Sequence, residues 1–435
     1  MAQPEEQDEP YYVMYDADFG LSGLAGRAGG ELLPLPEGEV EGDEQLGEDA
    51  RSLLESDLTD EVIRTLWLAA DRGRFDPTAR GTTIRSWLRA WSEAYPPPAP
   101  KRPRAATKYV SVIKPPNGPR APAKGAMRDA VLAEIGAVEA DLVRAVPVPG
   151  TVAALRSAVV EADEELGFRL LLRILKAHSV TVAKGRYDRF VELSDPFGYP
   201  FAVIRDDLRV DWPPIDITRR DSSWNFGFSE LVSRFSGEWF EYTAREVVRD
   251  TARYDDVLQP PGTAAAVLLA DVTRLHASEL SDDALTALWL AGSDGGFRID
   301  RYSIDVRRWL EQIADVCRER LRDVAPDHHP APAPVRADLA DEVLRELREI
   351  APELVTREVQ PHWHPIPGAV VARALEQVVT QVDPDLGFRM FLRALVALGM
   401  FLTRARLARY KALGERFGYG EFHVTEVDHR VQSDE

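Results

Sequence analysis

Four arginines have the residue type and the spacing to hold an anion. Arg169 and Arg173 stand four residues apart, and Arg389 and Arg393 repeat this spacing later in the chain. Side chains at i and i+4 share one face of a helix, so two guanidinium groups could grip a carboxylate or a phosphate in forked geometry. The alternative, which we favour, is that these arginines pair with acids of their own chain such as Asp163 or face solvent.

Two further candidates for ligand binding are the tryptophans Trp67 and Trp289. Each lies on the first helix of a predicted helical hairpin, with a second tryptophan, Trp87 or Trp309, on the partner helix. Tryptophan pairs across adjacent helices usually bury about 200 Å² per ring. We therefore expect them in the core, with an aromatic ligand cage as the alternative.

Motifs for catalysis, metals and cofactors do not emerge. The triplet from Asp18 to Gly20 has the letters of a kinase metal-binding motif, but it lacks the upstream elements that a kinase needs. His362 and His364 could present two imidazoles to a metal, yet no third ligand stands at a suitable spacing. A lone Cys317 excludes an internal disulfide framework. We predict no catalytic residue, no metal site and no cofactor.

These residues belong to a sequence that repeats itself. The segment 163–199 returns without a gap at 383–419, and both copies keep Leu-Gly-Phe-Arg near the start and Phe-Gly-Tyr at the end. The segment 18–31 has a counterpart at 225–238. We interpret the chain as a tandem duplication, with a polar leader at 1–10, copy 1 at 11–217 and copy 2 at 218–435.

Helical periodicity dominates both copies. Leu166, Leu170 and Ile174 share one face of an expected amphipathic helix, whose other face carries Arg169, Arg173 and Lys176. Short strands are expected in the apolar stretches 201–204 and 420–426, and a solvated loop in the acidic stretch 37–49. We predict a mainly α fold, in which two copies of a helical module pack around a pseudo-twofold axis as a former homodimer would.

A basic, proline-rich stretch interrupts copy 1 between residues 96 and 124. Proline at this density favours an extended linker without a core of its own. Internal pairing with the acids of 37–49, binding to nucleic-acid phosphates and recognition by a proline-motif reader stay open as alternatives. Its seven basic residues are Lys101, Arg102, Arg104, Lys108, Lys114, Arg120 and Lys124.

Composition limits the partners. The 435 residues carry a formal charge of −19, which repels nucleic acids and anionic membranes unless a local basic patch intervenes. The acidic start MAQPEEQDEP does not have the basic and then apolar pattern of an export signal, and no apolar run is long enough to cross a bilayer. We expect a cytoplasmic protein.

For function, we predict a non-catalytic protein that binds another protein, as an inhibitor or immunity-type factor against a basic partner. One alternative is a small-ligand-binding protein or enzyme with a pocket between the copies, and another is nucleic-acid binding through the basic stretch. The pocket alternative predicts a cleft in which Arg169 or Arg389 faces Trp67 or Trp289, whereas a binder predicts a solid interior with its charge outside.

Overall fold

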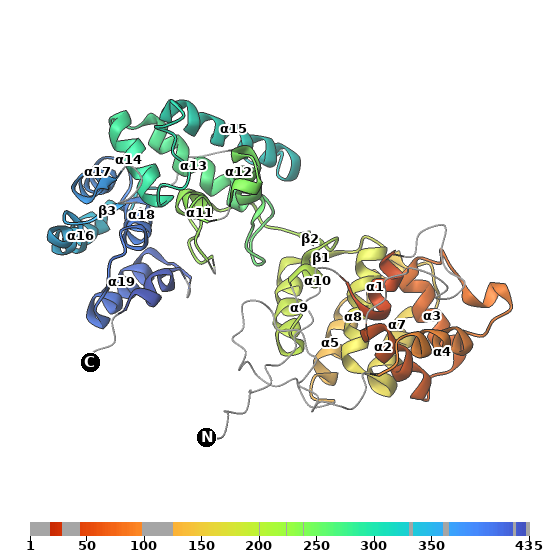
Figure 1. The fold of residues 1–435 in the computed structure, drawn as a ribbon. Helices are drawn as coiled ribbons and strands as arrows, with labels where there is room; N and C mark the ends of the chain where they lie inside the picture. The colour runs from red at the N-terminus through yellow and green to blue at the C-terminus, as the bar shows by residue number, and fades with distance from the viewer. Residues whose placement is uncertain are drawn as a thin grey trace, which may run out of the picture. The chain divides into compact units, whose positions relative to one another are not determined.

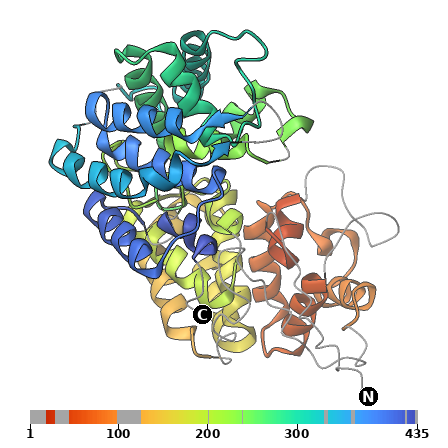
Figure 2. The same cartoon turned by 60° about the vertical axis from the view of Figure 1, so that its left-hand side comes forward.

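The computed structural model describes residues 18–27, 44–97, 125–199, 201–222, 224–237, 239–329, 334–359, 365–420 and 423–431. The basic stretch from Lys101 to Lys124, the pair His362 and His364 and the leader 1–10 lie outside these residues. Contacts divide the chain into two compact units, Met1–Trp212 (unit 1) and Pro213–Glu435 (unit 2). The described part of each unit is mainly helical with a few short strands, as the sequence predicts (Figures 1 and 2).

Unit 1 is a stack of helices with one small parallel sheet at its edge (Figure 1). Its strands are β1 (Thr181–Ala183) and β2 (Arg209–Asp211), with Thr181 opposite Arg209. Its helices are α1 (Gly20–Arg27), α2 (Glu44–Glu55), α3 (Asp60–Asp71), η1 (Pro77–Arg80), α4 (Ile84–Ala94), α5 (Arg128–Ala137), α6 (Glu139–Ala145), α7 (Thr151–Ser157), the π-helical turn η2 (Ala158–Ala162), α8 (Glu164–Ala177), α9 (Lys184–Phe197) and α10 (Phe201–Arg205).

Unit 2 is also helical, with the antiparallel strands β3 (Glu358–Val359) and β4 (Ile366–Pro367). Its helices are α11 (Gly227–Arg234), η3 (Trp239–Glu241), α12 (Ala244–Arg253), α13 (Thr263–Ala277), α14 (Asp282–Gly292), α15 (Val306–Val324), η4 (Ala337–Leu339), α16 (Ala340–Leu354), α17 (Gly368–Gln381), α18 (Pro384–Ala397), α19 (Arg404–Phe417) and η5 (Val424–Arg430).

One central helix organises each unit. In unit 1, α8 packs against α1, α3, α5 and η2, and in unit 2, α18 packs against α11, α14, α17 and η5. A helix surrounded on all sides must be apolar or must pair its charges. The helix predicted around Leu166 is present as α8, but its basic face is largely enclosed, because Arg169 and Lys176 are only 2% and 7% exposed.

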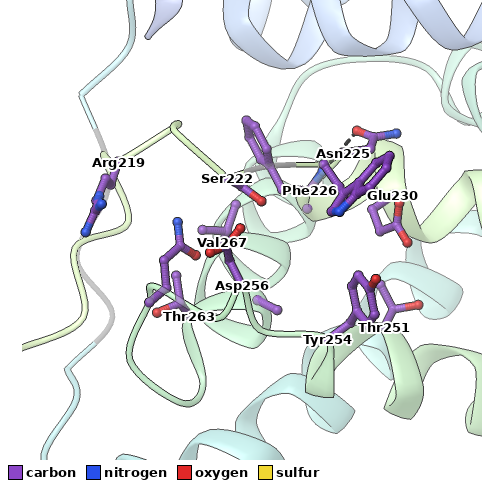
Figure 3. Close-up of a pocket in the computed structure, with 14 residues that line it drawn as sticks. Arg219, Ser222, Asn225, Phe226, Glu230, Thr251, Tyr254, Asp256, Thr263 and Val267 are labelled. Carbon is purple, nitrogen blue, oxygen red and sulfur yellow. Dashed lines mark hydrogen bonds between the residues drawn. The ribbon is translucent and has the colours of Figure 1, made fainter. Parts of the chain in front are cut away.

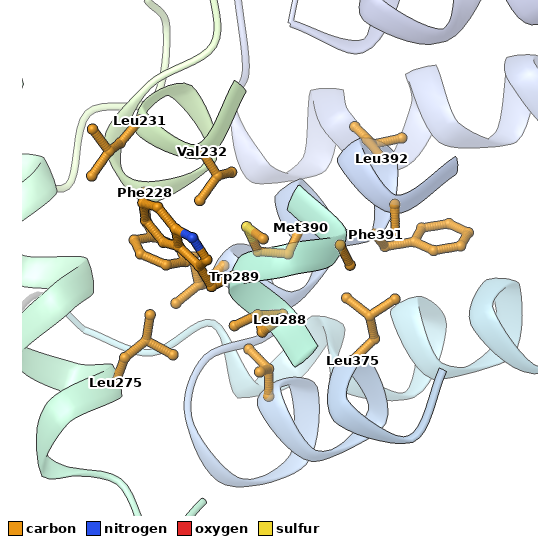
Figure 4. Packing of buried hydrophobic residues seen from close by; sticks show 14 of the residues in the cluster. Phe228, Leu231, Val232, Leu275, Leu288, Trp289, Leu375, Met390, Phe391 and Leu392 are labelled. Carbon is orange, nitrogen blue, oxygen red and sulfur yellow. The ribbon is translucent and has the colours of Figure 1, made fainter. Parts of the chain in front are cut away.

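The core of unit 2 gathers around Trp289 on α14. Phe228 of α11, Leu275 of α13 and Met390 of α18 converge on it (Figure 4). The Phe228 and Trp289 ring centroids are 5.9 Å apart. Apolar contacts from four helices thus close this interior.

Two predicted strands are wrong. Residues 201–204 lie in α10, and the described end of 420–426 enters the 3-10 helix η5. Each follows a glycine in the left-handed conformation, Gly198 or Gly418, that ends the preceding helix. A short apolar run fits a buried helical turn as well as a strand, so periodicity could not separate the two.

Candidate functional site

Arg169 of unit 1 is held by a carboxylate of its own chain. Its Nη1 and Nη2 donate to Oδ2 and Oδ1 of Asp49 on α2 at 2.7 and 2.6 Å. The guanidinium also lies 4.7 Å from the centroid of the Phe19 ring. Burial acts to lower the pKa of Arg169, but the Asp49 charge offsets it and holds that pKa well above its ordinary value. The pair therefore ties α8 to α2 and to the start of α1.

Arg389 of unit 2 is held in the same way. It donates to both carboxylate oxygens of Asp271 on α13 at 3.0 and 3.1 Å and to Asp385 at 3.1 Å. Its guanidinium lies 4.6 Å from the centroid of the Phe226 ring. Although burial acts to raise the pKa of Asp385, Arg389 and Arg220 hold it below its ordinary value. Asp385 is therefore a carboxylate at neutral pH.

The other two candidate arginines also have partners inside their own units. Arg173 donates to Asp18 and to the Ala70 carbonyl, both at 3.4 Å. Arg393 donates to the Gly292 carbonyl at 3.2 Å. Intrachain pairing is thus the arrangement that the described residues show for all four arginines.

The tryptophan candidates lie in the core. Trp67 and Trp289 are 2% and 1% exposed, and each donates its indole N–H to a backbone carbonyl at 2.8 Å, of Phe75 and Phe297 respectively. The ring centroids of Trp67 and Trp87 are 4.6 Å apart. Arg169 and Arg389 contact carboxylates and phenylalanine rings. The surroundings of these two arginines therefore differ from the cleft, with an arginine facing a tryptophan, that the pocket alternative predicts.

Sequence reasoning missed the two carboxylates that matter most inside the units. Asp49 belongs to α2 and is 2% exposed, so its assignment to a solvated acidic loop was wrong. Asp271 matches Asp49 at the same offset that relates Trp67 to Trp289. Extending the hairpin alignment toward the N-terminus would have found this pair.

Cysteine and metal chemistry find no support in the described part of the chain. Burial raises the pKa of Cys317 to about 12, so its thiol is protonated and unreactive at neutral pH. Across the described ranges, no three His, Cys, Asp or Glu side chains come together as a metal site.

A surface hollow in unit 2 offers a different kind of site. Two adjoining cavities of about 40 and 410 Å³ share a wall of Trp224, Asn225, Glu230 and Tyr254. We call them together the aromatic groove, because Trp224 and Tyr254 are 41% and 56% exposed. Glu230 and Tyr254 lie on one side of it, and Thr263 and Val267 of α13 lie on the other (Figure 3).

Helix ends position the wall of the aromatic groove. Trp224 and Asn225 lie just before Phe226, the N-cap of α11, and the first turn of α11 carries Glu230. Tyr254 is the residue that ends α12. Asn225 Oδ1 accepts hydrogen bonds from the Phe226 N–H at 3.0 Å and from the Ser229 hydroxyl at 2.6 Å. These hydrogen bonds fix the backbone around Asn225, where the segment before α11 lines the groove.

Charge in the aromatic groove is mixed. Arg234 donates to Glu230 at 2.8 Å and lies 4.8 Å from the centroid of the Tyr254 ring. The hydroxyls of Thr251 and Thr263 donate to backbone carbonyls, so they are not paired with a general base. The groove offers aromatic faces and a carboxylate, which suit recognition of an apolar or cationic side chain.

His423, the residue before η5, lines the larger cavity. It is 2% exposed and lies between Phe226 and Tyr419, at centroid distances of 4.9 and 4.3 Å. Burial, aided by the Arg389 charge, lowers its pKa to about 4. His423 is thus a neutral imidazole near pH 7, and its ring packs against Phe226 and Tyr419 in the interior of unit 2.

Comparison with family models, with curated proteins and with solved structures returned no match in any of the three cases. Among the helices that the structure describes, none combines the length and the apolar character needed to span a membrane. Function must therefore be argued from the geometry of this chain.

Proposed function

We propose that the chain is a non-catalytic binding protein that recognises a basic segment of another protein through the aromatic groove. The observation that carries this proposal is the pair of half-exposed rings, Trp224 and Tyr254, that line two adjoining cavities together with Glu230. Large aromatic side chains supply contact area at a small cost in side-chain entropy, and they are enriched at the centres of protein interfaces.

Charge favours a basic partner. Arg234 already lies over the Tyr254 ring, which is the geometry that an incoming lysine or arginine would adopt on the Trp224 ring. Glu230 lines the same cavities and supplies a carboxylate, which in the free protein accepts a hydrogen bond from Arg234. The net charge of −19 would accelerate the encounter with a cationic partner at low salt.

The size of the larger cavity is compatible with side chains of a peptide. The larger cavity, of about 410 Å³, is open to solvent and adjoins a smaller one. Such a space admits one or two side chains of an extended segment, and its volume also falls within the range of about 300–1,000 Å³ that is usual for small-molecule pockets.

The test is selection from a random peptide display library on the whole chain, followed by titration calorimetry of the enriched peptides. We expect lysine or arginine in every enriched sequence, and about tenfold weaker binding, or about 1.4 kcal/mol, for Trp224→Ala and for Tyr254→Ala. Glu230→Gln should weaken binding and reduce its salt dependence. Tyr302→Ala is the matched control, because Tyr302 is 69% exposed in the same unit but does not line the groove.

Two outcomes would refute the groove as the recognition site. One is enrichment of peptides without basic residues, and the other is equal affinity of the enriched peptides for wild type and for Trp224→Ala with Tyr254→Ala.

We also propose that the two units descend from one duplicated module. Matched contacts support this: Arg169 and Arg389 pair with Asp49 and Asp271, and each guanidinium lies over a phenylalanine ring. Packing of the units around a pseudo-twofold axis remains a prediction, which crosslinking of the whole chain with mass-spectrometric mapping would test.

A further inference from the structure

A second hollow lies in unit 1 and is lined mainly by cations. We call it the basic pocket. It has a volume of about 490 Å³. Four of its lining residues are Arg72, Arg173, Lys176 and Arg209, and Asp207 is the carboxylate among them.

Local structure brings these cations together from three elements. Arg72 follows α3 in the left-handed conformation, with φ of 64°. Arg173 and Lys176 lie near the end of α8, and Arg209 begins β2, whose pairing with β1 fixes its place.

Counter-charge is short in the basic pocket. Asp18 serves two cations, since Lys176 Nζ donates to it at 2.6 Å and Arg173 Nη1 at 3.4 Å, and the buried Asp71 carboxylate also interacts with the charge of Arg173. For Arg72 and Arg209, no carboxylate of the described chain lies within ion-pair distance. Positive potential therefore accumulates in the pocket, and a hollow of this kind attracts anions.

Unit 2 provides an internal comparison. Its hairpin helix α14 ends as α3 does: the amide of Gly73 donates to the Leu68 carbonyl and that of Gly295 to the Leu290 carbonyl, both at 2.8 Å. The residue before the glycine is Arg72 in unit 1 and Asp294, with φ of 48°, in unit 2. Unit 2 thus places a carboxylate of its own where unit 1 places a cation.

The surroundings of Asp294 show what that carboxylate does. The charges of Arg393 and Arg430 both stabilise it, against a burial that raises its pKa. Arg393 corresponds to Arg173, whereas Val396 stands where unit 1 has Lys176. Unit 2 therefore carries fewer cations at this corner. In unit 1, Asp18 and Asp71 offset Arg173 and Lys176, so among the described residues the cations that have no counterpart carboxylate are Arg72 and Arg209.

We propose that the basic pocket of unit 1 binds a small molecule bearing a multivalent oxyanion, a phosphate or a polycarboxylate, in the place that Asp294 fills in unit 2. Arg72 and Arg209, both exposed, would make charge-assisted hydrogen bonds to it, and the largely buried Arg173 and Lys176 would add fixed positive charge. This site is separate from the aromatic groove, so it stands or falls independently of the proposed function.

Titration calorimetry of the whole chain at low ionic strength tests the proposal, with inorganic phosphate, pyrophosphate and citrate as probes. We expect at least one probe to bind with a Kd below about 1 mM, and its affinity to fall as salt is added. Binding of pyrophosphate without citrate would identify a phosphate ligand, and binding of citrate alone a carboxylate ligand.

Variants of the pocket residues test the site, and one of them gives unit 1 the residue type that unit 2 has at the matching position. Arg72→Asp should reduce probe binding at least about tenfold without loss of the fold, because aspartate tolerates the left-handed conformation at an exposed position. Arg209→Gln should act in the same direction. Arg144→Gln, at an exposed arginine of the same unit outside the pocket, should leave binding unchanged. Failure of all three probes to bind, or undiminished binding to Arg72→Asp, would overturn the proposal.

Discussion

Arg169 and Arg389 carry full charges inside the two units, and each is tolerated because a carboxylate and a backbone carbonyl receive its hydrogen bonds. Phe19 and Phe226 supply those carbonyls, together with a ring under each guanidinium. Buried charge of this kind is costly to leave unpaired but contributes little beyond an apolar substitute when paired. It specifies which helices meet rather than adding large stability.

Removing only one charge of the Arg169–Asp49 pair should therefore destabilise unit 1 far more than removing both charges. Arg169→Met is expected to lower the free energy of unfolding of unit 1 by about 3–5 kcal/mol, because Asp49 is left buried without a counter-charge. Adding Asp49→Asn should restore part of that loss. Hydrogen exchange of α8 peptides in urea would measure both effects, with Arg144→Met as an exposed control. Equal stability of Arg169→Met and Arg144→Met would contradict the structural role.

His423 makes the stability of unit 2 depend on pH. Its pKa is about 4 in the folded unit against an ordinary value of 6.5, so between these values the unfolded chain binds a proton that the folded unit does not. Stability should fall as pH drops from about 6.5 and level off near 4, by on the order of 3 kcal/mol from this group.

The check on His423 is a comparison of unfolding midpoints across that pH range with those of His423→Gln. The variant should show a smaller loss between pH 6.5 and 4. Parallel pH profiles for the two proteins would show that His423 does not contribute.

At the scale of elements, close approach of two helices explains why both copies keep a glycine before the buried phenylalanine. Gly167 of α8 faces Val159 of η2, and Gly387 of α18 faces Val379 of α17, with no room for a methyl group in either case. Gly167→Ala should thus destabilise unit 1 by about 1–3 kcal/mol through overpacking.

Val159→Ala added to Gly167→Ala should relieve part of that cost, since Val159 Cγ2 is the atom that the new methyl group would meet. Thermal unfolding of the single and double variants measures the difference. Additive destabilisation by the two changes would argue against this contact.

Helical periodicity was enough to predict the helical class and the hairpins with Trp67 and Trp289. It could not place short apolar runs, which became α10 and η5, because one turn of helix and one short strand bury the same residues. It also could not show that Arg169 is enclosed, since α8 is surrounded by elements far away in sequence. The sequence did not single out Trp224 and Tyr254, because the exposure of an aromatic ring depends on how distant elements pack around it.

At the scale of the whole molecule, the chain comprises two compact units, and the boundary in the sequence falls between Trp212 and Pro213. Trp212 packs on Tyr187 of unit 1 with ring centroids 4.9 Å apart, whereas Ile217 lies in the core of unit 2. Each unit thus has its own interior. We expect 1–212 and 213–435, expressed separately, to give cooperative thermal unfolding and helical circular dichroism. A non-cooperative profile for either would contradict this division.

The two units have similar interiors but different surface cavities, which suggests that they bind different ligands. Unit 2 carries the aromatic groove, and unit 1 carries the basic pocket. The central functional claim concerns the groove, so the decisive test must locate a bound peptide on the intact chain.

Hydrogen–deuterium exchange of the whole chain, with and without a basic peptide selected on it, provides that location. The account predicts added protection in the segments 219–234, 251–267 and 423–431, which line the groove, and none in residues 18–212. Protection confined to unit 1, or absent from the segments around Trp224 and Tyr254, would contradict the assignment of the groove as the recognition site.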